Sequence, residues 1–219
     1  MKNAVTAGFH AVSEVAALNR SMRVFFKKTG GAKYISHLDL QRTMQRALKR
    51  ARLPVWETEG FNPHIYLTFA LPLSLGVESL CESFDIKMTE EINGDEIRAK
   101  LNVALCPDMA VIKAAEPVRK PTEIQKAQYE IVCDTRKFHE ILGQNEIIIN
   151  KKTKKGQAQV DIKPMIELKE TSENKVTLIL PAGGNLNLNP LAVIGACEGL
   201  KAAGITRTAI FCADGEVFN

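Results

Sequence analysis

The sequence predicts an α+β protein made of two ferredoxin-like halves in tandem. The composition is that of a globular protein, because 45% of the 219 residues are hydrophobic and 25% are charged. Over residues 22–116, strand-like runs and amphipathic segments follow the order β-α-β-β-α-β, which is the split βαβ arrangement. A similar order returns over residues 127–219. We expect residues 1–21 to form an N-terminal extension and residues 117–126 to form a linker between the halves.

The first half begins with a strand and continues into a strongly amphipathic helix. Residues 23–28 are rich in strand-forming side chains. Ser36 and Asp39 then nearly match a capping box, and Pro54 sets the end of the helix near residue 52. Apolar side chains fall on one stripe of this helix and basic side chains lie roughly opposite. The other elements expected in this half are strands at 65–71, 83–88 and 110–114 and a helix at 95–105.

The second half contains segments of the same kinds. Pro190 suits the first turn of a helix over residues 190–201, because proline at that position loses no helical hydrogen bond. No repeat is visible in the residues themselves, so the likeness of the halves depends only on the order of their elements. The remaining elements expected here are strands or extended segments at 129–133, 146–150, 164–168, 175–180 and 206–212 and a helix at 136–142.

Several classes of function are disfavoured by missing patterns. The chain has no Walker A loop, GxGxxG, HExxH or GxSxG motif. Its five cysteines form no CxxC pair, so no zinc or iron–sulfur site is written locally. No apolar run reaches the roughly 18 residues that span a bilayer. We therefore expect a cytoplasmic protein with no cofactor, no metal and no membrane contact. A metal site of His37 and His64, completed by Cys81 or Glu82, is a minor alternative that no ligand spacing supports.

The first candidate site is the predicted helix start at Ser36, His37 and Asp39. The N–H groups and the dipole of a helix start attract anions, so a phosphate fits there. His37 would then suit a general acid or base. The alternative is structural, with Ser36 and Asp39 capping the helix and His37 packing at the edge of the apolar stripe. Both interpretations remain open.

The second candidate site is the loop at residues 60–64, whose sequence is GFNPH. Glycine and proline shape the turn, and the rings of Phe61 and His64 suit stacking on nucleobases. Alternatively, Phe61 fills the core beneath the loop and His64 caps a strand. The residues do not decide between these two interpretations.

The third candidate site consists of basic residues, which form two clusters in the sequence although the formal net charge is only +4. A basic helical stripe and a basic hairpin tip both suit a nucleic-acid backbone, whereas a basic outer helix face is also common on solvated surfaces. The residues are Arg42, Arg46 and Lys49 on the first helix, and Lys152, Lys154 and Lys155 in the second half.

Residues 34–40 (YISHLDL) and 60–64 (GFNPH) are quite specific together, and residues 69–79 and 155–164 add further blocks in a familiar order. In these motifs the chain resembles the bacterial radical-SAM-linked protein family over about residues 22–211. That family is a domain of unknown function, encoded beside radical S-adenosylmethionine (SAM) enzymes or fused to them. The resemblance marks a family and does not by itself mark a chemistry.

The resemblance implies that this chain is the stand-alone companion of a radical SAM enzyme. It has no cysteine triad to hold the cluster of such an enzyme, so it is not expected to perform that reaction itself. Arg42 and Arg46 fit the basic helix of the family. The implied ligand-binding surface consists of Ser36, His37, Asp39, Asn62 and His64.

Three functions remain open. The leading hypothesis is a non-catalytic RNA-binding or substrate-presenting protein that acts with a radical SAM enzyme on transfer RNA or another structured RNA. The main rival is a metal-independent endoribonuclease, in which His37 or His64 is the general acid or base and Lys33 or an arginine stabilises the phosphate. The third is a module that docks the radical SAM enzyme without touching nucleic acid.

Overall fold

The structure is a computed structural model that describes residues 20–153, 156–184 and 186–219. Most of the predicted N-terminal extension therefore lies outside the described residues, and the first strand begins at Arg20. The elements of the first half are β1 (Arg20–Lys28), the 3-10 turn η1 (Gly30–Tyr34), α1 (His37–Arg50), β2 (Leu67–Phe69), β3 (Glu78–Met88), α2 (Gly94–Ala104) and β4 (Met109–Ala115).

The second half begins at a 3-10 turn and contains two helices and six strands within the described residues. Its elements are η2 (Pro121–Glu123), β5 (Ile124–Cys133), α3 (Thr135–Leu142), β6 (Ile148–Thr153), β7 (Gly156–Asp161), η3 (Lys163–Met165), β8 (Glu167–Thr171), β9 (Lys175–Pro181), α4 (Pro190–Ala196) and β10 (Ala202–Cys212).

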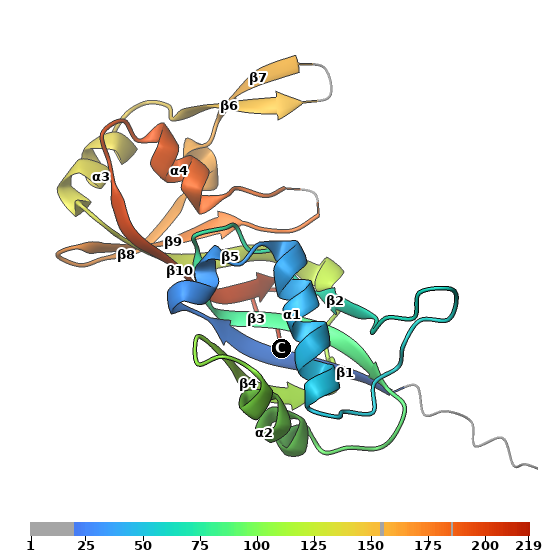
Figure 1. The fold of residues 1–219 in the computed structure, drawn as a ribbon. Coiled ribbons are helices and arrows are strands. Elements are labelled where there is room, and N and C mark those ends of the chain that lie inside the picture. The colour runs from blue at the N-terminus through green and yellow to red at the C-terminus, as the bar shows by residue number, and fades with distance from the viewer. Residues whose placement is uncertain (1–19, 154–155, 185) are drawn as a thin grey trace, which may run out of the picture.

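One large mixed sheet runs through both halves and confirms the predicted α+β class (Figure 1). Its strands lie in the order β4-β1-β3-β10-β5-β9-β8, and β2 pairs with β3 beside this path. The neighbours pair antiparallel except for β3 and β10, which are parallel and meet where Glu78 and Ser79 lie opposite Thr206 and Arg207. This short parallel contact is where the halves join. Strands β6 and β7 form a separate hairpin.

Two hydrophobic clusters form the core. The first contains residues between Met22 and Val111 and includes the buried stripe of α1, which Figure 1 shows lying across β1 and β3. The structure therefore confirms the predicted amphipathic helix. Its buried residues are Leu40, Met44, Ala47 and Leu48.

The second cluster is built from β5, β9 and β10 with α3 and α4, and it also takes in two residues of the first half. Leu71 and Val77 flank the loop between β2 and β3, and both are buried in the second cluster. The loop at residues 71–77 therefore packs against the second half, although its chain belongs to the first.

Several strands and one helix differ in length from the prediction. The strand predicted at 65–71 is only Leu67–Phe69, because β10 takes over the edge of β3 at Glu78 and Ser79. The helix predicted over 190–201 ends at Ala196, and Gly199 follows with a φ of 70°. Strand β5 begins at Ile124, inside the segment predicted as a linker. The predicted domain boundary itself remains a prediction.

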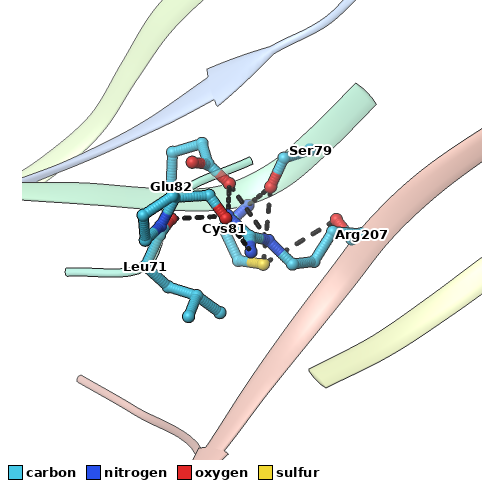
Figure 2. A network of polar contacts seen from close by, with 6 residues as sticks. Leu71, Ser79, Cys81, Glu82 and Arg207 are labelled. Carbon is cyan, nitrogen blue, oxygen red and sulfur yellow. Dashed lines mark hydrogen bonds and ion pairs between the residues drawn. The ribbon is translucent and has the colours of Figure 1, made fainter. Parts of the chain in front are cut away.

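A buried ion pair crosses the join between the halves (Figure 2). The guanidinium of Arg207 on β10 pairs with the carboxylate of Glu82 on β3, and both side chains are at most 2% exposed. Arg207 also donates to the backbone oxygens of Leu71 at 3.0 Å and Pro72 at 3.3 Å. Burial is the largest single influence and acts to lower the pKa of Arg207, but the charge of Glu82, its hydrogen bond and the neighbouring Tyr129 and Cys81 together raise the pKa overall. Burial on this scale requires such a partner.

A third buried charge lies next to this pair. Lys28, at the end of β1, is 1% exposed and donates from Nζ to the backbone oxygen of Ile35 at 3.1 Å. Burial lowers the pKa of Lys28, and the nearby charge of Glu82 opposes that shift.

No described helix is long and apolar enough to cross a membrane. All five cysteines are free thiols, and Cys133, Cys197 and Cys212 are buried in the core.

Candidate nucleic-acid interface

The start of α1 is a well-formed cap. The Ser36 hydroxyl accepts a hydrogen bond from the Asp39 backbone N–H at 3.2 Å and donates one to the Asp39 carboxylate at 2.7 Å. Asp39 also pairs with Arg42 at 3.3 Å, one turn along the helix. The hydrogen bond from Ser36, with help from Arg42, lowers the pKa of Asp39 below its usual value. Because the Asp39 carboxylate already neutralises this helix start, Ser36 and Asp39 act here as capping residues.

The outer face of α1 is basic, as predicted. Arg42, Arg46 and Lys49 are all exposed and lie opposite the buried stripe of the helix. Lys49 forms an exposed ion pair with Glu57 at 3.0 Å, whereas Arg46 forms no ion pair with any described residue. Exposed pairs of this kind are weak and readily exchanged for another anion. The face can therefore offer up to three cations to a ligand.

The basic face borders a shallow pocket of about 200 Å³, which we call the α1 pocket. The loop that follows α1 supplies its opposite wall through His64 and Ile65. The α1 pocket is lined by Arg42, Gln45, Arg46, Lys49, His64 and Ile65. Four of the predicted site residues thus meet in one place.

Hydrogen bonds hold the loop of residues 57–66 beside α1. The Gln45 side-chain amide donates to the backbone oxygen of Ile65 at 2.8 Å. Two hydrogen bonds between Thr58 and His64 close the base of the loop. The Thr58 backbone N–H donates to the His64 backbone oxygen at 2.8 Å, and the His64 backbone N–H donates to the Thr58 hydroxyl at 3.2 Å. These two contacts with Thr58 therefore fix the backbone position of His64.

The imidazole of His64 is exposed and has one engaged nitrogen. Its Nδ1 lies 3.0 Å from the Thr58 hydroxyl and 3.0 Å from the backbone oxygen of Asn62. If Nδ1 carries the proton, it can donate to that oxygen, which leaves Nε2 as an acceptor. Among the described residues, none forms a hydrogen bond with Nε2. His64 can thus present Nε2 as an acceptor to a ligand in the α1 pocket.

Phe61 does not fill the core beneath its loop, so that interpretation was wrong. Its ring is fully exposed at the tip of the loop, and Asn62 beside it is exposed as well. Gly60 has a φ of 123°, a backbone conformation that residues other than glycine rarely adopt, and this turn projects Phe61 outward. An exposed ring on the loop that also lines the α1 pocket can serve as a stacking platform of the kind that single-stranded nucleic-acid binders use.

His37 is exposed but does not line the α1 pocket. Its ring packs edge-on against Phe69 with the centroids 5.1 Å apart, which is a packing role at the edge of the first core. Lys33, the cation considered beside it, forms an ion pair with Glu78 at 3.1 Å. The hydrogen bond to Glu78 raises the pKa of Lys33. The Lys33 ammonium is thus paired within the protein, and the ring of His37 packs against Phe69 outside the α1 pocket.

The predicted residues fall into three groups. Arg42, Arg46, Lys49 and His64 share the α1 pocket, Phe61 and Asn62 lie on its loop, and Ser36, His37 and Asp39 lie at the helix start. The side chain of Lys152, together with Lys154 and Lys155, lies outside the described residues. No group of three metal-ligating side chains is found in the described part of the chain.

Sequence reasoning missed Gln45 and the position of Ile65. Gln45 lies on the same side of α1 as Arg42 and Lys49, at helical spacings of three and four residues. That spacing could have placed it on the face. Its partner could not have been found, because the backbone oxygen of Ile65 carries no sequence signal.

Comparison with known protein families identifies a match over residues 21–190, to a family described as "Uncharacterized protein conserved in bacteria (DUF2344)". The chain belongs to this family. The match includes α1, the loop of residues 57–66 and most of the second half. No curated protein matches the chain.

Proposed function

We propose that this protein is a non-catalytic RNA-binding accessory protein, and that RNA runs along α1 with its phosphates on Arg42, Arg46 and Lys49. The carrying observation is the α1 pocket, where these three cations and His64 line one surface. Phe61, fully exposed on the adjoining loop, offers a ring on which a base can stack. Single-strand binding combines cations that contact the phosphate backbone with an aromatic ring on which bases stack, and this surface offers both.

The first experiment is RNA binding as a function of salt. The protein is purified from its host at moderate salt, the RNA that remains bound is sequenced, and its affinity is measured by fluorescence anisotropy. The variant Arg42→Ala/Arg46→Ala/Lys49→Ala is expected to bind more weakly and to reduce the slope of log K against log salt by about 2, for three phosphate contacts on a single strand.

A charge-matched control is available on the large sheet. The control replaces three lysines that do not belong to α1, namely Lys126 on β5, Lys169 on β8 and Lys175 on β9. The variant in which all three are alanine loses the same net charge as the α1 variant. We expect this control to keep most of the salt slope. Equal losses in both variants would show attraction by net charge alone and would contradict the proposal.

We propose in addition that the protein acts with a radical SAM enzyme in the cytoplasm, as the sequence motifs suggest. The test is capture of the tagged protein from its host, followed by nuclease treatment and identification of the enzymes that remain bound. Retention of a radical SAM enzyme supports the partnership. If that enzyme is retained while purified protein binds no RNA, a docking module replaces the RNA-binding proposal.

A metal-independent endoribonuclease is the second candidate, and the observation that favours it is His64 beside Arg42 and Arg46 in the α1 pocket. A histidine next to a cation can exchange a proton while the cation stabilises the phosphate. Incubation of the bound RNA with purified protein and a chelator tests this candidate. Cleavage that is lost in His64→Ala would establish it, and intact RNA would remove it.

We propose that the two halves are two ferredoxin-like units. The strand order across the sheet supports this. It is β4-β1-β3-β2 in the first half and β10-β5-β9-β8 in the second, so in each half the last strand along the chain lies beside the first, followed by the third and then the second. For this comparison β8 and β9 take the places of β2 and β3, and the hairpin β6-β7 is an insertion. A crystal structure in which the halves superpose strand on strand would test the proposal.

A further inference from the structure

A second pocket lies between the two halves, away from the residues that line the α1 pocket. It has a volume of about 410 Å³, within the range of roughly 300–1,000 Å³ that holds small ligands. Pockets of this kind occur preferentially where two structural units meet. This inter-half pocket is lined by Pro72, Leu73, Ser74 and Val77 of the first half and by Tyr129, Asn187, Asn189 and Pro190 of the second.

The inter-half pocket is held in shape by buried contacts. Arg207 donates to the backbone oxygens of Leu71 and Pro72, and its own position is fixed by Glu82. At the other end of the same loop, the Gly76 backbone N–H donates to the Lys33 oxygen at 2.9 Å. The first-half wall is therefore tied at both ends. Walls fixed in this way bind a ligand without first losing conformational entropy.

The floor of the inter-half pocket is buried and carries one polar group. Val77 is fully buried and Tyr129 is 5% exposed. Burial raises the pKa of the Tyr129 phenol, although the Arg207 charge opposes this shift. The phenol is consequently neutral at physiological pH and keeps its proton. A neutral phenol can donate one hydrogen bond to a ligand.

The rim adds two amides, of which Asn189 offers donors and Asn187 can both donate and accept. Asn189 uses its Oδ1 to accept from the Leu191 backbone N–H at 3.0 Å, which leaves its amide N–H groups as donors. Asn187 is exposed and forms no hydrogen bond with any described residue, so its oxygen and its N–H groups are both available. Asparagine amides of this kind pair with the edges of nucleobases through one donor and one acceptor.

The pocket also selects against charged ligands. Among the described residues, no acidic or basic side chain lines it. An ion taken from water into such a site would lack a partner, whereas a neutral ring can use the apolar surfaces of Pro72, Leu73 and Pro190. A flat heterocycle with donors and acceptors on its edge satisfies both kinds of wall.

We propose that the inter-half pocket binds a nucleobase, with the amide of Asn187 pairing with its edge. The proposal does not depend on the path of RNA along α1, because the two pockets share no lining residue. The base can come from a free nucleoside or from RNA, and the experiment separates these sources.

The test is binding of adenosine, guanosine, cytidine and uridine by saturation-transfer NMR and calorimetry, with ribose as the negative control. We expect at least one nucleoside to bind saturably and ribose not to bind. Asn187→Leu is expected to weaken the binding by about tenfold, the scale of one lost base contact. Asn187 is exposed, so this variant should fold, and its thermal unfolding checks that it does.

Asn145→Leu is the matched control, because the exposed Asn145 does not line the inter-half pocket, and nucleoside binding should be unchanged in it. If the base belongs to RNA, Asn187→Leu should weaken oligonucleotide binding without changing the salt slope. The nucleoside should then also compete with RNA. A free nucleoside as the source predicts no effect on oligonucleotides. The proposal is overturned if no nucleoside binds at millimolar concentration, or if Asn187→Leu binds as well as the unaltered protein.

Discussion

The basic residues of α1 differ in their ion pairs from the lysines of strands β5 and β9. In the second half, Lys126 on β5 pairs with Glu167 on β8 at 3.0 Å, and Lys175 on β9 pairs with Glu130 on β5 at 2.9 Å. In the first half, Arg46 on α1 has no such partner among the described residues, and Arg42 and Lys49 have only exposed ones. The sheet lysines thus serve cross-strand pairing. The cations of α1 remain accessible, which is why we place the ligand there.

The join between the halves gives the largest expected effect. Arg207→Met should lower the free energy of unfolding by about 3–5 kcal/mol, because Glu82 would remain buried without its partner. Urea unfolding followed by circular dichroism measures this. Arg207→Met/Glu82→Leu should recover part of the loss, since neither member of the pair is then buried without the other, although the buried Lys28 loses the nearby charge of Glu82. Lys126→Ala, which breaks an exposed pair, should lose at most about 1 kcal/mol.

The same measurement shows how independent the halves are. If the ion pair couples them, the unaltered protein unfolds in one transition and Arg207→Met separates it into two. A single transition with an unchanged midpoint in Arg207→Met would show that Arg207 does not hold the halves together.

Charge reversal compares the two sets of cations directly. Arg46→Glu on α1 and Lys126→Glu on β5 change the net charge equally. On the proposed function, Arg46→Glu should weaken RNA binding by about tenfold or more, equivalent to about 1.4 kcal/mol. Lys126→Glu should change it less than about twofold, a fraction of that energy. Anisotropy titrations at one salt concentration measure both, and the reverse order would move the interface to the second half.

The helix starts allow a comparison in which the halves should agree. Ser36 caps α1 and Asp134 caps α3, each accepting a backbone N–H from three residues further on. Ser36→Ala and Asp134→Ala should each lower the free energy of unfolding by about 1 kcal/mol. Ser36→Thr should retain most of the stability. A loss of RNA binding in Ser36→Ala at unchanged stability would instead assign Ser36 to the interface.

The pH dependence of stability should reveal the buried Lys28, with the smallest effect. Burial lowers the pKa of Lys28 below its ordinary value of 10.5, so the unfolded chain holds this proton more tightly than the folded protein. The contribution of Lys28 to stability should therefore rise as the pH increases from its folded-state pKa to 10.5. Urea unfolding of Lys28→Met across this window should lack that rise. Parallel curves for the two proteins would contradict it.

Lys33 is the matched control within the first half, because its pKa is shifted the other way. The hydrogen bond to Glu78 raises it, so the contribution of Lys33 is present below 10.5 and is lost as the pH rises through the folded-state pKa. Lys33→Met should therefore remove a fall in stability where Lys28→Met removes a rise.

Local patterns predicted much of the first half. The helix α1, its cap at Ser36 and its basic face all follow from residues within a few positions of one another. The exposed Phe61 was one of two open interpretations, and the structure decided it. Strand lengths were less predictable, since β2 is limited by β10, which lies more than a hundred residues away along the chain.

The sequence by itself determined the α+β class, the amphipathic helix and its accessible cations, because helix periodicity and capping act over a few residues. Only the tertiary structure decided that Arg207 meets Glu82, that His64 lies against α1 and that a pocket opens between the halves. The ion pair and the inter-half pocket depend on the parallel contact of β3 with β10, at a separation of about 125 residues, whereas His64 is held beside α1 by contacts with Gln45 and Thr58 within the first half. No local propensity specifies such a pairing, since it forms only when burial of both cores brings the two strands together.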